Sequence, residues 1–105
     1  MRQPQQNNGR IFAAELIGTA VLMLGGPGTA ILAADAVGVL GVALAFGFSL
    51  VIMAYVIGPV SGCHINPAVT LGMLLAKKID RLHAVFAWAG QIVGALFGGL
   101  IVFGI

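Results

Sequence analysis

The sequence predicts an all-α membrane protein with three transmembrane helices and one re-entrant half-helix, which enters the bilayer without crossing it. Hydrophobic residues make up 60% of the 105 residues, charged residues only 8%, and the mean hydropathy is +1.09. An average soluble domain is about 25% charged. Three apolar runs are long enough to span a bilayer, and a short stretch with helix-terminating residues separates the last two. The composition therefore excludes a soluble domain, and we expect the lipid bilayer as the surroundings.

The first span is predicted from Ile11 to Ala34, after a polar tail at residues 1–10. At about 1.5 Å per residue this run can cross a hydrocarbon core about 30 Å thick. It contains one acid, Glu15. The sequence Gly25-Gly-Pro-Gly28 would end a helix in water, but a span that ended there would be too short. We therefore expect a kinked or broken helix after a disordered tail.

The second and third spans are predicted from Val37 to Ile57 and from Leu82 to Ile105. Gly58-Pro59 predicts the end of the second helix. In the third, Gly90, Gly94 and Gly98 recur at four-residue spacing, which predicts a face that packs closely against another helix. Because this run reaches the last residue without a polar flank, we expect a chain that continues.

The distribution of positive charge predicts the topology. Arg2 and Arg10 precede the first span, and a second basic group follows residue 76. Basic residues favour the cytoplasmic side, so an even number of crossings must separate the two groups. The first two spans supply that number, which predicts a multi-pass protein of the cell membrane with a cytoplasmic amino terminus. We read this charge as a determinant of topology and expect no nucleic-acid partner.

Residues 59–76 must then begin and end on the cytoplasmic side, as a cytoplasmic loop or as a re-entrant one. Because residues 68–76 are nearly all apolar, we predict that the segment enters the membrane and leaves it on the same side. Asn66 can cap a helix and Pro67 suits its first position, while Lys77 and Lys78 suit its carboxyl end. A helix from Pro67 to Ala76 would be about 15 Å long, half a bilayer. Its amino end would therefore lie near the membrane midplane.

An extended segment must reach that point, and non-helical backbone at this depth needs protein or water around it. The carbonyls of Gly62, Cys63 and His64 therefore predict a wet lumen, into which the Asn66 amide would donate. Cys63 beside His64 could also suggest a thiol nucleophile or a metal site. No further cysteine or acid cluster accompanies them, so we expect neither an enzyme nor a metal or other cofactor.

His83, beside Arg81, is predicted to lie at the membrane interface, and Gln91 to be a buried polar residue with a partner on a neighbouring helix. From its position alone, Glu15 could equally be a solvated acid at the interface or a buried one.

The stretch His64-Ile-Asn-Pro-Ala-Val-Thr70 resembles the first Asn-Pro-Ala signature of the aquaporin and glycerol-facilitator family. The resemblance extends, in order, to Ala14-Glu15 with Gly18-Thr19, to Val42–Gly47 and to Ala89-Gly-Gln91. It implies one half of a fold built from two inverted repeats, a passive water channel and a homotetramer.

The resemblance also implies roles for individual residues. Asn66, with Pro67 and Ala68, would form the first signature and donate to water at the pore centre. Gly62, Cys63 and His64 would supply half of the carbonyl ladder. Phe46 would form the aromatic side of the outer constriction, and Glu15 would support the loop through His64 and its backbone. These assignments complete the set of predicted site residues.

Three functions remain open. Phe46 favours a water channel, because glycerol facilitators usually have tryptophan there, although glycerol or another small neutral solute is the alternative. The second Asn-Pro-Ala, the constriction arginine and the constriction histidine have no counterpart in these 105 residues. The chain is therefore expected to be the amino-terminal half of a channel, or a non-conducting half-channel that binds full-length channels through Gly90, Gly94 and Gly98. Sequence beyond Ile105 would separate these two hypotheses.

Overall fold

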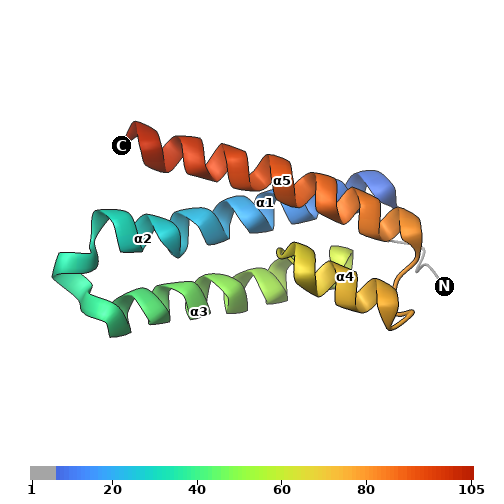
Figure 1. Ribbon diagram of the computed structural model, residues 1–105, viewed down its shortest axis with the longest axis horizontal. Coiled ribbons are helices and arrows are strands. Elements are labelled where there is room, and N and C mark those ends of the chain that lie inside the picture. The colour runs from blue at the N-terminus through green and yellow to red at the C-terminus, as the bar shows by residue number, and fades with distance from the viewer. Residues whose placement is uncertain (1–6) are drawn as a thin grey trace.

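The computed structural model describes residues 7–105, and these residues form helices joined by short connections. Figure 1 shows α5 along one side of α1 and α3 returning along the other side, with α4 beside the end of α3. The helical body measures 46 × 25 × 21 Å. The helices are α1 (Asn8–Gly25), α2 (Pro27–Leu32), α3 (Ala34–Ser61), α4 (Pro67–Leu75) and α5 (Arg81–Gly104).

The predicted fold class is confirmed. Residues 8–32, 34–61 and 81–104 form three helical segments that are long and apolar enough to cross a membrane. The described residues include no strand, and one short helix, α4, lies between the second and third segments. The arrangement therefore has the three spans and the half-length helix that the sequence predicts.

The first span is a broken helix. It begins at Asn8, where the side chain of Asn7 accepts a hydrogen bond from the Arg10 amide. Residues 8–10 are thus helical, and the prediction that the whole tail is disordered is wrong for them; residues 1–6 lie outside the described part. The break falls at Gly26, with φ −84° and ψ −82°, and α2 restarts at Pro27. Proline lacks the N–H that an uninterrupted helix needs there.

The second span is longer than predicted. The prediction that Gly58-Pro59 ends the helix is wrong, because α3 continues through Pro59 to Ser61. Only one backbone hydrogen bond is lost at a proline, and membrane helices tolerate that loss where neighbours pack around them. The helix ends at Gly62, whose φ of 90° is left-handed and whose N–H donates to the Gly58 carbonyl at 2.8 Å. Near its start, α3 is kinked at Gly38.

The glycines of α5 bring its backbone against α1. A methyl group on Gly90 would lie 2.5 Å from the Phe12 carbonyl oxygen, and one on Gly98 would lie 2.9 Å from the Ala20 carbonyl oxygen. Gly94, between them, faces the Leu16 carbonyl in the same way. The two helices run in the same direction (Figure 1). The glycines of α5, four residues apart, therefore meet backbone carbonyls of α1 that are also four residues apart: those of Phe12, Leu16 and Ala20.

This glycine face is therefore occupied within the chain. Its three glycines, Gly90, Gly94 and Gly98, are all buried. Helix α1 thus covers the face that the half-channel hypothesis assigns to the binding of full-length channels.

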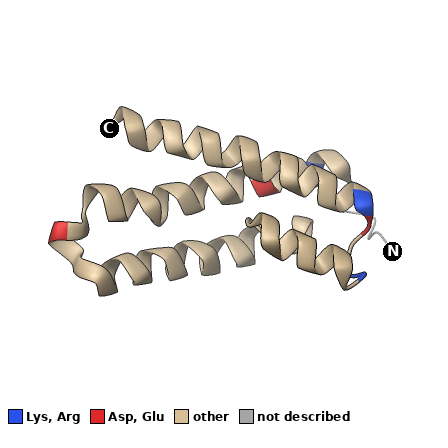
Figure 2. Cartoon of the chain, in the orientation of Figure 1, with Lys and Arg blue, Asp and Glu red and all other residues tan. Residues whose placement is uncertain are grey.

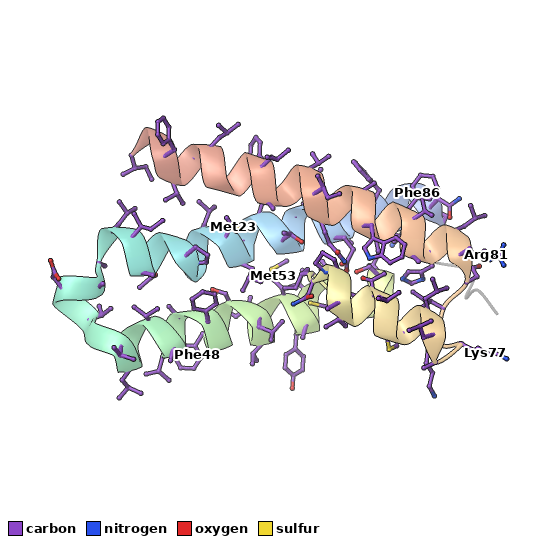
Figure 3. The ribbon with its side chains drawn as sticks, viewed as in Figure 1. Met23, Phe48, Met53, Lys77, Arg81 and Phe86 are labelled. Atoms are coloured by element: carbon purple, nitrogen blue, oxygen red, sulfur yellow. The ribbon has the colours of Figure 1, made fainter. Side chains whose placement is uncertain are left out.

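The positive charges gather at one end of the long axis. Figure 2 shows the described lysines and arginines at the end where α5 begins, whereas the acidic residues lie at that end, in the middle and at the opposite end. In Figure 3, Lys77 and Arg81 extend from the basic end, whereas Met53 points between α3 and α1. Arg2 lies outside the described residues. Arg10, the described member of the first basic group, thus shares one end with the second group, as the topology argument requires.

Candidate functional site

The chain turns back sharply between α3 and α4. Gly62, Cys63 and Ile65 have φ values of 90°, 52° and 39°, all in the left-handed region. Glycine adopts this region freely, but a β-branched residue such as isoleucine rarely does, and each such residue costs about 1–3 kcal/mol. Surrounding contacts must therefore hold this loop, which we call the pore loop and define as residues 62–66.

Glu15 supplies most of these contacts. Its side chain is fully buried. Oε2 accepts hydrogen bonds from Ser61 Oγ at 2.6 Å and from the His64 amide at 3.0 Å. Oε1 accepts from the Ile65 amide at 2.7 Å and from Gln91 Nε2 at 2.8 Å. One carboxylate thus ties the pore loop to α1 and α5, and the alternative of a solvated interfacial acid is wrong.

His64 meets Glu15 through its backbone and not through its ring. The ring nitrogen Nδ1 lies 2.9 Å from Thr70 Oγ1, and Gln91 Nε2 donates to the same hydroxyl at 2.8 Å. Gln91 therefore has partners on α1 and on α4, as its predicted packing role requires. Thr70 is fully buried and was missed by the sequence analysis. Its position four residues after Asn66, one turn along the same helix face, could have indicated it.

Asn66 caps the short helix. Its Oδ1 accepts a hydrogen bond from the Ala68 amide at 2.8 Å, and Pro67 occupies the first helical position. The helix ends at Leu75, with Ala76 as its carboxyl cap, one residue before the predicted end. Among the described residues, the NH₂ group of Asn66 donates to no protein atom, so two donors remain for a ligand.

The pore loop forms one wall of a cavity of about 260 Å³. The backbone carbonyls of Gly62, Cys63 and His64 accept no hydrogen bond from residues 7–105. Apolar side chains of α1, α3 and α4 line the rest. The cavity is lined by Leu22, Leu50, Cys63, His64, Ile65, Asn66 and Val69.

Phe46 lies next to this cavity but is not one of its lining residues. It is one helical turn before Leu50 on α3, which places both on the same face. A methyl group on Gly26 would lie 2.5 Å from the Phe46 ring, so the ring packs on the break between α1 and α2. Phe46 is 38% exposed and thus retains a free face.

His83 is buried against the end of α3. It is only 4% exposed, and its Nε2 lies 2.8 Å from the Ser61 carbonyl oxygen. Its ring stacks on that of His64, with 5.5 Å between centroids. The sequence did not predict this burial or these partners. Helical spacing could have indicated its burial, since His83, Ala87 and Gln91 fall on one face of α5.

Comparison with known proteins assigns the family. Residues 3–105 match the sequence profile of Major intrinsic protein. The chain is 43% identical to Aquaporin Z of Brucella melitensis over 96 residues, which cover 88% of this chain and 42% of that protein. It is 41% identical to Aquaporin Z of Rhodopseudomonas palustris over 96 residues, 88% of this chain and 40% of that protein. It is 42% identical to Aquaporin-5 of Ovis aries over 93 residues, 88% of this chain and 35% of that protein.

The chain thus spans about two fifths of the length of the curated relatives that it matches. The match begins before α1 and continues to the last residue of α5, so it includes the pore loop, Glu15 and Asn66. The chain therefore belongs to the major intrinsic protein family of membrane channels.

Proposed function

We propose that this chain forms the amino-terminal half of a passive water channel. The observation that carries the proposal is the cavity wall: Cys63 and His64, whose carbonyls accept no hydrogen bond from residues 7–105, line it together with Asn66 and its free NH₂ group. A ligand that both accepts and donates hydrogen bonds fits this wall, and water is the smallest such ligand. The relatives named Aquaporin support the same class of substrate.

The electrostatics of the wall favour a neutral ligand. The carboxylate of Glu15 is buried beneath the pore loop, where four protein donors occupy it, so it does not face the cavity. The amino end of α4 places positive partial charge at Asn66, which raises the barrier to cations and protons. The described lysines and arginines lie at the far basic end (Figure 2).

We place the chain with its basic end in the cytoplasm, and hence with a cytoplasmic amino terminus. The clustering of Arg10, Lys77 and Arg81 at one end supports this orientation. Helix α4 then rises from the cytoplasmic surface to Asn66 near the midplane, as a re-entrant half-helix. We propose that the complete protein forms a homotetramer, with a pore in each subunit.

A substitution at Asn66 tests the proposed water-channel function. The change Asn66→Asp retains the capping oxygen but removes the two donors and adds negative charge. We expect water permeability to fall about tenfold, the effect of one lost hydrogen bond to the permeating molecule, and cation exclusion to weaken. The measurement is osmotic swelling of proteoliposomes that contain the product of the complete gene.

A matched control is Asn7→Asp, because Asn7 caps α1 by the same kind of bond and is exposed. This variant should conduct as the unaltered protein does. Wild-type permeability in Asn66→Asp would contradict the proposal. A further experiment uses proteoliposomes that contain residues 1–105 alone. We expect no water flux through them, because half of the pore wall is missing.

Phe46 tests the choice between water and glycerol. Its ring packs on Gly26 and projects from the same face of α3 as the cavity residue Leu50. We expect Phe46→Ala to widen the passage and to raise the ratio of glycerol to water permeability. The control is Phe48→Ala, because Phe48 is 62% exposed and points away from α1 (Figure 3). An unchanged ratio in Phe46→Ala would exclude Phe46 from the constriction.

A further inference from the structure

We propose that His83 is a positioning residue for the pore loop, which it holds through the Ser61 carbonyl. His83 Nε2 lies 2.8 Å from that oxygen, and the residue is only 4% exposed. Because a carbonyl oxygen can only accept, Nε2 must carry the proton of this bond. The backbone of His83 is itself held, since its amide donates to Asp80 Oδ1 at 2.7 Å at the start of α5.

Ser61 is the point at which the direction of the pore loop is set. It is the last residue of α3, and the two residues that follow are left-handed. Its hydroxyl donates to Glu15 and accepts from the Cys63 amide at 3.2 Å. With the carbonyl bound to His83 as well, the peptide plane that precedes Gly62 is fixed. The orientation of the following residues, of which Cys63 and His64 line the cavity, depends on this plane.

The His83 ring makes a second contact with the loop. It stacks on the His64 ring with an interplanar angle of 19°. The groups that contact the two histidines come from α1, α3 and α4: Glu15 at the His64 amide, the Ser61 carbonyl at the His83 ring and Thr70 at the His64 ring. The hydrogen bond and the stacking contact can therefore be separated by substitutions that keep one and remove the other.

Helix α5 holds the far end of the pore loop as well. Trp88 lies five residues after His83 on α5. Its Nε1 donates to the Pro67 carbonyl at 3.1 Å. The two carbonyls that α5 holds, those of Ser61 and Pro67, thus lie on either side of the pore loop. This arrangement gives His83 a role in conduction, an inference that rests on the proposed function.

The experiment compares His83→Gln with His83→Phe in the full-length protein. Glutamine can place an N–H near the position of Nε2, whereas phenylalanine keeps the stacking ring and loses the donor. We expect His83→Phe to lower water permeability per channel about fivefold to tenfold, the effect of leaving one buried acceptor unpaired. We expect His83→Gln to stay within about twofold of the unaltered protein.

Cys63 provides a readout that does not depend on conduction. It is the single cysteine of these 105 residues, lies in the pore loop and lines the cavity. The rate at which a water-soluble methanethiosulfonate labels it should change about threefold or more in His83→Phe, because the loop relaxes, and little in His83→Gln. Labelling of a Cys63→Ser version gives the background. His83→Asn, whose amide is too short to reach Ser61, should behave like His83→Phe and serves if that variant does not fold.

Three results would overturn the inference. The first is unchanged labelling and permeability in both His83→Phe and His83→Asn, the variants that cannot donate to Ser61. The second is a His83→Gln variant as impaired as His83→Phe, which would show that a donor to the Ser61 carbonyl is not what supports the loop. The third is a permeability loss without any change in labelling. If the unaltered protein conducts no water, the proposed function fails, and Cys63 labelling alone decides the role of His83.

Discussion

Replacing Glu15 by alanine is expected to destabilise the protein by more than about 4 kcal/mol and to abolish conduction. The change leaves four buried donors without an acceptor: Ser61 Oγ, the amides of His64 and Ile65, and Gln91 Nε2. Each orphaned group costs about 1–3 kcal/mol, and the left-handed residues of the loop lose the contacts that hold them. Thermal unfolding in detergent and osmotic swelling measure the two effects.

Glu15→Gln refines this test, because its side chain has the same shape. The amide oxygen can accept two of the four bonds, but its NH₂ group would face the remaining donors. We therefore expect an intermediate loss of stability and a large loss of flux. The control is Asp35→Asn. Asp35 is an exposed acid at the end of the helical body that is opposite the basic residues, so this change should alter neither stability nor flux. If Glu15→Gln folded and conducted normally, the support role of Glu15 would be wrong.

Replacing Gly94 by alanine is expected to have the second largest effect. A methyl group there would meet the Leu16 carbonyl oxygen, a backbone atom that cannot move aside without separating α1 from α5. Overpacking of this kind costs about 3 kcal/mol. Because Glu15 and Gln91 bridge the same two helices, the separation should also weaken the support of the pore loop. Thermal unfolding in detergent and osmotic swelling again give the readouts.

At other glycines of α5, the expected loss of stability depends on how close the nearest backbone atom lies. Gly98→Ala should be milder, since its methyl group would lie 2.9 Å from the nearest backbone oxygen. Gly104→Ala is the matched control on the same helix, because no atom of the described residues lies within 4 Å of its added methyl group. Equal stability of the Gly94 and Gly104 variants would contradict close packing of α5 on α1.

Local features of the site were predictable because their causes are local. The Asn66 cap joins atoms two residues apart, and Pro67 follows from its fixed φ angle. The spans follow from the length of the apolar runs, and the glycine face of α5 follows from its four-residue spacing. The break at Gly26-Pro27 follows from the missing proline N–H.

Other features depend on partners far away in the chain. Glu15 accepts bonds from residues 46, 49, 50 and 76 positions later, so no local pattern could decide between a buried and a solvated carboxylate. The burial of His83 depends on the Ser61 carbonyl, 22 positions earlier. The end of α3 at Ser61 rather than Ile57 is set by Gly62 and by the packing that surrounds Pro59.

The sequence by itself determined the fold class, the three spans and the helix start at Asn66, because hydropathy, capping and proline geometry act within a few residues. Only the tertiary structure decided how the strained pore loop is held and which side chains hold it. The physical reason is that buried donors and acceptors must be paired, and the pairing depends on which helices lie side by side. Glu15, Thr70 and His83 acquire their roles from that arrangement.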